Sequence, residues 1–233
     1  MTRSDEFSLI KAGSALEVKE GSEVAFVVFG GIAEGIGVPP FEFRRMMAEI
    51  PVSTLYVRDV SQAWYHLGID DGDRSLEGAA EHIAKVLSGI GARRTVFIGN
   101  SMGGFAAILL GQKLKADRII AFAPQTYVDF ATRLRSLDFR WFRQVAMMYR
   151  KRGLRCPTYN LRSYLRRNPL ASPASIYFGT GSRLDSRHAR ELEGMPNITL
   201  FEQQGAGHDM VKSLKLSGEL HRMLLAATQL AGS

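Results

Sequence analysis

The stretch VFIGNSMGGFAAILLG, residues 96–111, runs from an apolar segment through a glycine-rich turn into a second apolar segment. The first segment, 95–99, is rich in β-branched and aromatic residues and predicts a strand. The second, 103–114, is apolar nearly all round, which is typical of a buried helix. A strand that passes through a tight turn into a buried helix favours an α/β architecture, and it sets Asn100 and Ser101 apart as polar residues that need an explanation.

Further strand-like and helix-like segments alternate on both sides of this stretch. Runs of β-branched and aromatic residues predict strands, and amphipathic runs predict helices. Because the two kinds alternate, we expect a mostly parallel central sheet with helices on both faces. Strands are expected at 24–29, 53–60, 118–124, 174–179 and 197–203, and helices at 41–50, 75–91 and 209–230, the last interrupted near Gly218.

Residues 127–170 break this alternation with short helical patches that are rich in arginine and aromatic residues. Between Arg133 and Arg167 the chain carries ten arginines and one lysine against a single acid. We therefore expect a core made of 1–126 and 171–233, with 127–170 inserted as a basic, aromatic helical cap or lid.

The net charge of +7 follows largely from this basic stretch. Such a stretch suits an anionic partner, or it is simply a solvated surface. We do not expect nucleic acid as the partner, because no zinc-finger, basic-zipper or RNA-recognition signature accompanies the charge. The pattern does not indicate an oligomeric state.

Cys156 is the only cysteine, so the chain cannot form an internal disulfide, and a cysteine-based metal site is not expected. No apolar run is long enough to cross a bilayer, and the first residues lack the apolar core of a secretory signal. We expect a cytoplasmic protein that needs neither a metal nor an organic cofactor.

Residues 99–103 spell Gly-x-Ser-x-Gly between the predicted strand and helix. In this context the pattern indicates a sharp, strained turn that lifts the Ser101 hydroxyl above the sheet, while the glycines avoid collisions. The backbone N–H of Met102 then lies at a helix N-terminus and can donate to a developing oxyanion. The alternative is that the glycines only let the strand and the helix pack closely.

A serine nucleophile needs a base, and His208 is the best placed of the five histidines. It follows the last predicted strand in QQGAGHDM, where small residues leave room for the ring, although it could instead serve only a helix-capping loop. His66 lies in a loop, and the surface of helical segments is the expected place for His82, His188 and His221.

The base in turn needs an orienting acid, and Asp185 follows the penultimate predicted strand in a Gly/Ser loop. Its alternative role is to cap the helix that comes next. Asp129 and Asp138, both in the predicted cap, are weaker alternatives.

The order Ser101, Asp185, His208 resembles that of the α/β-hydrolase superfamily. The resemblance covers nearly the whole chain and rests on GNSMGG, on RLD after a strand, on GAGHD before the last helix and on the glycine-rich turn after the first core strand. It implies the α/β-hydrolase fold, a Ser-His-Asp catalytic triad, and a lid in the position of 127–170.

One departure concerns the second oxyanion donor. Many members of that superfamily have His-Gly after the first core strand, whereas this chain has Phe29-Gly30-Gly31-Ile32. The donor is a backbone N–H, so the missing histidine does not remove it, and Gly31 or Ile32 is expected to supply it beside Met102. Alternatively, these glycines serve only to reverse the chain.

Trp64, Tyr65 and His66 follow the second predicted strand, and they either line the mouth of the site or pack the loop. Asn100, beside the serine, is grouped with them as a residue expected to contact substrate. An aromatic, cationic cap suits an acyl group on an anionic carrier or an acidic saccharide ester, although its aromatic residues could equally form the cap's own core.

The expected function is that of a serine hydrolase acting on an ester or thioester through an acyl-serine intermediate, foremost a carboxylesterase. A thioesterase or an acyltransferase would use the same residues on a carrier-linked acyl group. A binding protein without catalytic activity is the remaining alternative, because a fold does not fix a function.

Overall fold

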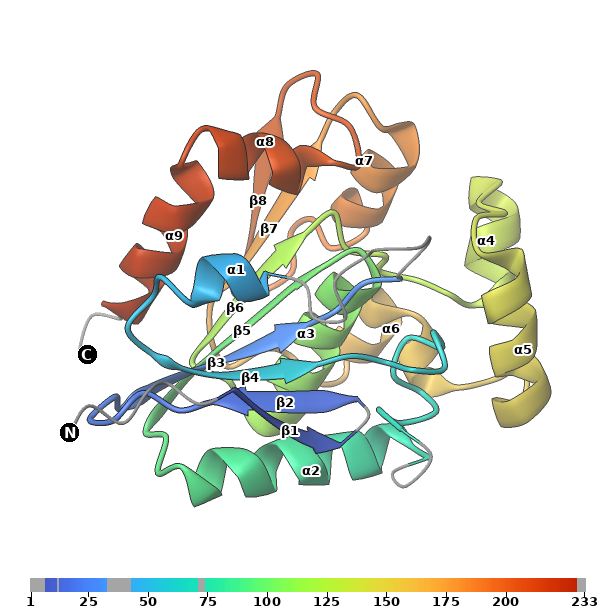
Figure 1. The fold of residues 1–233 in the computed structure, drawn as a ribbon. Coiled ribbons are helices and arrows are strands. Elements are labelled where there is room, and N and C mark those ends of the chain that lie inside the picture. The colour runs from blue at the N-terminus through green and yellow to red at the C-terminus, as the bar shows by residue number, and fades with distance from the viewer. Residues whose placement is uncertain (1–6, 12, 33–42, 71–73, 230–233) are drawn as a thin grey trace.

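A computed structural model describes residues 7–11, 13–32, 43–70 and 74–229, and its centre is a twisted sheet (Figure 1). The strand order among these residues is β1-β2-β4-β3-β5-β6-β7-β8. Strands β1 and β2 form an antiparallel edge on β4, and all the other pairs are parallel. The bounds are β1 Phe7–Lys11, β2 Ser14–Glu17, β3 Val24–Phe29, β4 Ser53–Val57, β5 Arg94–Asn100, β6 Arg118–Phe122, β7 Ala174–Gly179 and β8 Ile198–Gln203.

The predicted mostly parallel sheet is confirmed, with each predicted strand shifted by a few residues at most. The apolar run of β3 is buried along its whole length because helices cover both faces of the sheet. Val27 belongs to the buried cluster on one face and Val28 to the cluster on the other. The sequence did not predict β1 and β2, whose short segments are strands only through pairing with each other and with β4.

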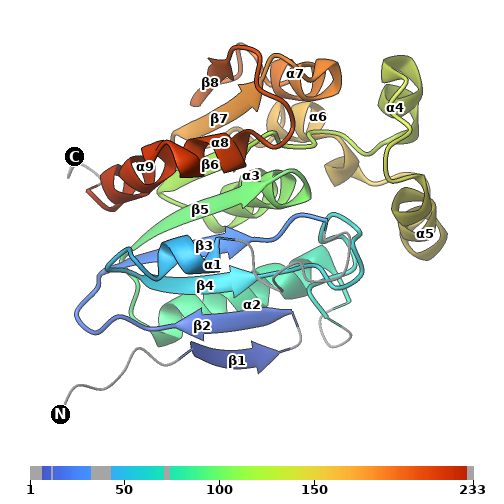
Figure 2. The same cartoon turned by 45° about the horizontal axis from the view of Figure 1, so that its top comes forward.

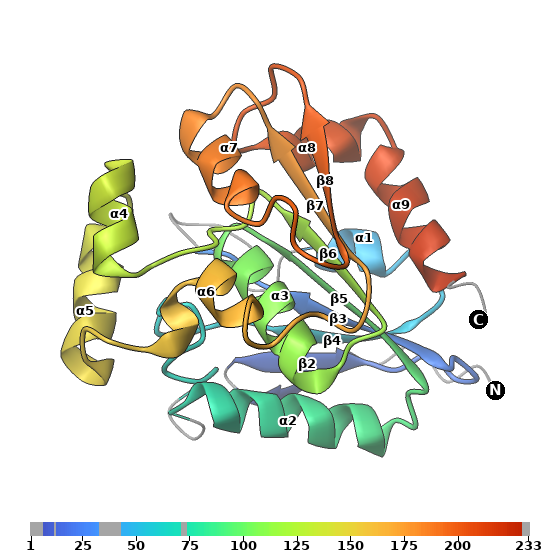
Figure 3. The ribbon, with the colours of Figure 1, turned by 180° about the vertical axis from the view of Figure 1, so that it is seen from behind.

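Two groups of helices cover the sheet (Figures 1 and 3). The first group packs on the cluster that contains Phe26 and Val28, and the second packs on the larger cluster around Phe29, Phe97 and Phe105. The first group consists of α1 (Arg44–Met47), α8 (Met210–Leu216) and α9 (Glu219–Thr228), and the second includes α2 (Leu76–Gly89), α3 (Met102–Leu114), α6 (Leu161–Leu165) and α7 (Arg183–Arg190).

The structure agrees with the predicted helices except for the first along the chain, which it shortens. Ser75 caps α2 as expected, because its side chain accepts the N–H of Gly78 at 3.0 Å. The last predicted helix is divided at Gly218 into α8 and α9. The helix predicted at 41–50 is only the short α1, and residues 33–42 lie outside the described part of the chain.

The insertion 127–170 contains α4 (Phe130–Ser136), α5 (Phe142–Arg152), the 3₁₀ helix η1 (Pro157–Tyr159) and α6. Figure 2 shows α4 and α5 projecting from the body on the side toward which the arrowheads of β3, β4 and β5 point. A β-bridge between Tyr127 and Asn160 ties the two ends of the projecting part together. The position suits a cap over the carboxyl ends of the strands, and movement as a lid stays a prediction.

None of the helices in the described ranges combines the length and apolar character needed to cross a membrane. The helices pack instead on the sheet or project beside it, as the views in Figures 1 and 2 show.

The turn between β5 and α3 is built on glycines that leave no room for a side chain. A Cβ on Gly99 would lie 2.2 Å from the carbonyl oxygen of Gly103, and a Cβ on Gly103 would lie 2.2 Å from that of Phe29. Both are backbone atoms in the buried core, so they cannot move aside cheaply. These contacts explain why the turn needs glycine on each side of Ser101.

Gly103→Ala should therefore destabilise the protein by about 3 kcal/mol or more, because overpacking a closed core forces the backbone to shift. Gly89→Ala is the matched control, since Gly89 is also helical but a Cβ there would meet nothing within 4 Å. The control should be neutral or stabilising by roughly 0.5–1 kcal/mol. Urea unfolding measures both changes, and equal effects in the two variants would contradict the packing argument.

Candidate active site

Ser101 stands at the junction of β5 and α3 in a conformation that L residues rarely adopt, with φ 55° and ψ −117°. Its N–H donates to the carbonyl of Phe122 at 2.9 Å, and its own carbonyl accepts the N–H of Gln125 at 3.2 Å. These bonds, to the last residue of β6 and to the chain that follows it, hold the strained turn in place. The sharp turn that the Gly-x-Ser-x-Gly pattern predicts is therefore present.

Two groups near Ser101 were expected to form an oxyanion hole. Met102 is the first residue of α3, where a backbone N–H has no partner within the helix. On the neighbouring strand, Gly30 is fixed because its N–H donates to Val57 and its carbonyl accepts the hydroxyl of Tyr65. Gly31 and Ile32 follow directly and are partly exposed, and their role as the second donor stays a prediction.

Asp185 and His208 are in direct contact, as the acid and base of a triad would be. The distance between His208 Nδ1 and Asp185 Oδ2 is 2.8 Å. Because a carboxylate only accepts, the proton lies on Nδ1, which leaves Nε2 free to act as an acceptor. Asp185 is buried, while the imidazole is 41% exposed at the surface of the site.

Asp185 lies in the first turn of α7 rather than in a loop. The side chain of Ser182 caps this helix by accepting the N–H of Asp185 at 3.3 Å. The capping role considered for Asp185 is thus taken by Ser182, and the carboxylate is left to face His208.

Ser101, Asp185 and His208 all follow the carboxyl ends of strands that lie within one half of the sheet, since β5, β7 and β8 are separated only by β6. Among the contacts of the described residues, no hydrogen bond joins Ser101 Oγ to the imidazole. In enzymes without substrate, the bond between nucleophile and base is often long and tightens only in the complex. The structure therefore joins the acid to the base and leaves the serine at the same edge.

Arg140 joins the acid to the projecting insertion. It precedes α5 and donates to Asp185 Oδ1 through Nη1 at 3.0 Å. Through Nη2 and Nε it also binds both oxygens of Asp138, at 3.0 and 3.1 Å. One guanidinium thus bridges two buried carboxylates, one on each side.

His188 completes this network, and its predicted surface position is wrong. The side chain is 1% exposed, stacks on Tyr127, and its Nε2 lies 2.9 Å from Asp138 Oδ2. Its Nδ1 accepts the N–H of Thr126 at 3.0 Å, so the ring is neutral with its proton on Nε2. Asp138 is therefore a partner of His188 and Arg140, and Asp129 caps α4 instead of serving as an acid.

The charges of this network shift the pKa values of its members. Burial alone would raise the pKa of Asp185, but the hydrogen bond and charge of His208, together with Arg140, outweigh it and hold the pKa below its usual value. The same balance, with His188 and Arg140 as partners, lowers the pKa of Asp138. Burial lowers the pKa of His188, which keeps that ring neutral.

Sequence reasoning missed Arg140 because the insertion holds ten arginines between 133 and 167, and nothing in their pattern distinguishes one of them. Asp138 offered the available signal, since it is the single acid in that stretch and so the natural partner for a nearby arginine.

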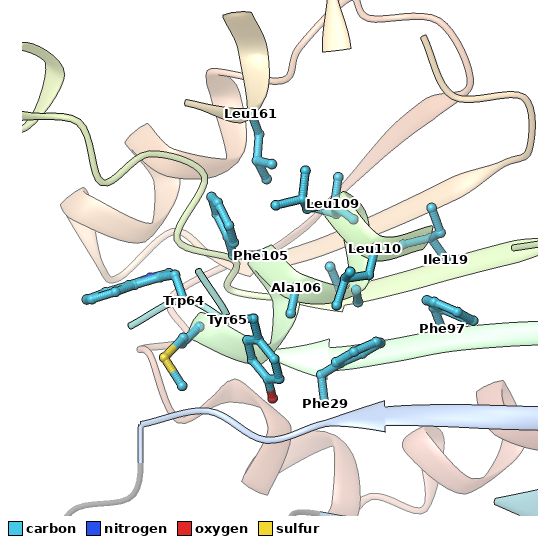
Figure 4. Close-up of a cluster of buried hydrophobic side chains, with 14 of the residues drawn as sticks. Phe29, Trp64, Tyr65, Phe97, Phe105, Ala106, Leu109, Leu110, Ile119 and Leu161 are labelled. Carbon is cyan, nitrogen blue, oxygen red and sulfur yellow. The ribbon is translucent and has the colours of Figure 1, made fainter. Parts of the chain in front are cut away.

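Trp64, Tyr65 and His66 are fully buried, which favours packing of the loop over contact with substrate. Figure 4 shows Trp64 and Tyr65 in the cluster around Phe105. Their turn follows Asp59, whose carboxylate accepts the backbone N–H groups of Ala63 and Tyr65 at 2.5 and 2.8 Å.

The same loop holds the insertion against the core. His66 Nε2 lies 3.0 Å from Thr158 Oγ1, and the indole of Trp64 donates to Gln125 at 2.8 Å. Burial lowers the pKa of His66 to about 4, so the ring is neutral at pH 7. Asn100, the last residue of β5, is partly buried beside Ser101, and its contact with substrate stays a prediction.

No group of three or more His, Cys, Asp or Glu side chains in the described ranges is arranged to hold a metal ion.

Replacing Arg140 by Gln should lower the free energy of unfolding at pH 7 by about 3 kcal/mol, because it leaves two buried carboxylates without their cation. The stabilisation that these carboxyls gain from their lowered pKa is present above pH ~4 and is lost as pH falls through the folded-state values. The deficit of the variant should therefore narrow below pH 4.

Urea unfolding between pH 3 and 7 measures this, with Arg143→Gln as a control that removes one exposed arginine of α5. The control should change stability by no more than about 0.5 kcal/mol. A deficit of the same size at pH 3 and pH 7 would show that Arg140 does not act through the carboxylates.

No known protein-family model matches the chain, and no curated protein matches it. Many solved structures are similar to it, among them the following three. An α/β hydrolase from the metagenome of lagoon sediments at Mar Chica, Morocco, has 14% identity and a TM-score of 0.63 over 96% of this chain and 99% of the other. A fluorophosphonate-binding serine hydrolase of Staphylococcus aureus has 12% identity and a TM-score of 0.63 over 91% of each chain.

The third is the capsule O-acetyltransferase of Neisseria meningitidis serogroup A, with 14% identity and a TM-score of 0.61 over 90% of this chain and 91% of the other. At such identities the likeness concerns the fold. Together with the mostly parallel sheet of eight strands in the described part of the chain and its two layers of helices, it shows that this chain has the α/β-hydrolase fold.

Proposed function

We propose that the protein is a serine hydrolase that cleaves a carboxylic ester through an acyl-serine intermediate. The observation that carries the proposal is the 2.8 Å contact between His208 Nδ1 and Asp185, at the edge of the sheet where Ser101 occupies a strained turn. A buried carboxylate that fixes the tautomer of a partly exposed imidazole is the arrangement that activates a serine.

In the proposed mechanism, Nε2 of His208 takes the proton of the Ser101 hydroxyl as the oxygen attacks the ester carbonyl. The ester C–O bond then breaks, and the same proton goes to the leaving alcohol. Asp185 stays ionised because its pKa is lowered, so it stabilises the imidazolium while this happens. The Met102 N–H, with a second donor from the turn after β3, holds the oxyanion.

Water attacks the acyl-serine in the second half of the reaction. His208 removes a proton from the water, and the Ser101 oxygen recovers one when the acyl bond breaks. No group beyond these side chains and backbone amides is required. Arg140 contributes as a positioning residue, since it holds the second oxygen of Asp185 and so fixes the carboxylate plane.

Acyl transfer to an alcohol in place of water is the second candidate, because the fold is shared with an O-acetyltransferase as well as with hydrolases. Both reactions pass through the same acyl-serine. A thioester donor would also use the same residues. Comparing the rates with short acyl esters and with acyl-thioesters separates an esterase from a thioesterase. Comparing the rates with and without an added alcohol separates hydrolysis from acyl transfer.

A fluorophosphonate probe should label the folded protein at a single peptide that contains Ser101. Ser101→Ala should abolish labelling, whereas Ser88→Ala, which changes an exposed serine of α2, should leave it intact. Mass spectrometry of the digested protein identifies the peptide. A wild-type protein that stays unlabelled while folded would indicate a binding protein on a hydrolase fold.

Ester hydrolysis should fall by at least about 1,000-fold in Ser101→Ala and in His208→Ala. Asp185→Asn should also lose activity, because the amide can stabilise neither the Nδ1–H tautomer nor the imidazolium. The measurement is kcat with a p-nitrophenyl ester, corrected for the rate of the reagent alone. Full activity of any of the three variants would remove that residue from the mechanism.

A further inference from the structure

A cavity of about 670 Å³ lies between α6, α7 and the end of β7, and arginines dominate its wall. A volume of this size is typical of sites for small molecules. The lining residues also include the hydroxyl-bearing Thr180 and Ser186, and one carboxylate, that of Glu191. The arginines are Arg162, Arg183, Arg187 and Arg190.

The spacing of α7 explains how the arginines come together. Positions 183, 186, 187 and 190 fall on one face of a helix, because residues three and four apart are neighbours. The opposite face carries Asp185, His188 and Ala189, which are all buried. The cavity is thus separate from the Asp185–His208 pair, although both are built on α7.

The charge of this wall is largely uncompensated. Arg187 donates to the carbonyl of Ser136 at 3.0 Å, and Arg162 donates to the carbonyl of Glu191. A carbonyl orients a guanidinium but does not neutralise it, so both cations keep their full charge. These two side chains are only partly exposed, which strengthens their electrostatic attraction for an anion.

The two remaining arginines are more exposed. Arg190 pairs with Glu202 at 2.9 Å, but both side chains are open to water, where such a pair contributes little. Among the described residues, Arg183 has no hydrogen-bond or ion-pair partner. Even with Glu202 counted beside Glu191, four cations face two carboxylates, and an anion with several charged oxygens would restore the balance.

We propose that this cavity binds a small molecule that carries two or more linked phosphate groups. A guanidinium binds two oxygens of one phosphate in a planar fork, and several such forks around one cavity suit a diphosphate or triphosphate better than a single carboxylate. A nucleotide and an inorganic polyphosphate share this chemistry. The proposal does not depend on Ser101 or on the proposed hydrolase reaction.

Isothermal titration calorimetry with inorganic tripolyphosphate and with ATP tests it. Wild-type protein should bind with a stoichiometry of one, and affinity should fall as salt is raised. Arg183→Gln and Arg187→Gln should each weaken binding by about 10-fold, the loss expected for one charge-assisted contact. Similar affinities for the two probes would indicate that the phosphates alone are recognised, whereas tighter ATP binding would point to a nucleotide as the source.

Arg143→Gln is the matched control, because it removes the same charge from α5 outside the cavity and should change affinity by less than about 2-fold. The melting temperature of Arg183→Gln should equal that of the wild type, since the substitution removes no hydrogen bond or ion pair of the described residues. Ser101→Ala should bind as the wild type does, so failure of the hydrolase proposal would leave this result intact.

Equal weakening by all three arginine variants would show attraction by net charge only and would overturn the proposal. The absence of saturable binding at about 1 mM of either probe would do the same. Binding of a single-stranded RNA that tripolyphosphate does not compete with would also overturn the proposal.

Discussion

The close approach of three backbone segments at the turn between β5 and α3 is the constraint on which the rest of the site depends. A side chain on Gly99 or Gly103 would meet backbone oxygen at 2.2 Å, so α3 packs against β3 and β5 with nothing between them. This contact fixes where α3 begins, and the start of α3 fixes both the strained Ser101 and the amide of Met102. The chemistry of the serine is therefore a consequence of packing in the core, and the polar residues of the turn are tolerated because the buried helix that follows holds them there.

A second constraint acts through charge. Asp138 and Asp185 are both buried, and ionised carboxylates in such positions are costly unless they are paired. Arg140 pairs with both, and each carboxylate also contacts one histidine, His188 in the case of Asp138 and His208 in the case of Asp185. Because Asp138 and Arg140 belong to the insertion and Asp185 to the core, the insertion is tied to the acid of the proposed triad. A displacement of the insertion would remove Arg140 from that carboxylate, so the position of the insertion and the pairing of Asp185 with His208 are linked physically.

The parallel sheet, the turn at Ser101 and the pairing of Asp185 with His208 could be anticipated because each is encoded locally. Continuous apolar runs mark buried strands, glycines mark the turn, and the acid and base follow strand ends that meet at one edge. The burial of His188 could not be anticipated, because it depends on Asp138, fifty positions away, folding back onto α7. The edge strands β1 and β2 depend in the same way on pairing with β4. Trp64 and Tyr65 show the same limit, since their loop is shaped by bonds to Asp59 that turn large aromatic side chains inward.

Helix α7 shows how one short element can serve two kinds of site. Its eight residues place Asp185 and His188 on a buried face, where every charge has a partner, and four lining residues of the cavity on the opposite face, where most of the charge has none. Stability alone explains the pairing on the first face, because an unpaired buried charge there would destabilise the packing of α7 on the core. It does not explain the second, since mutual repulsion among arginines opposes their gathering. A surface selected only for solubility would mix both signs of charge, so the excess of one sign around a cavity is better accounted for by an anion that occupies it.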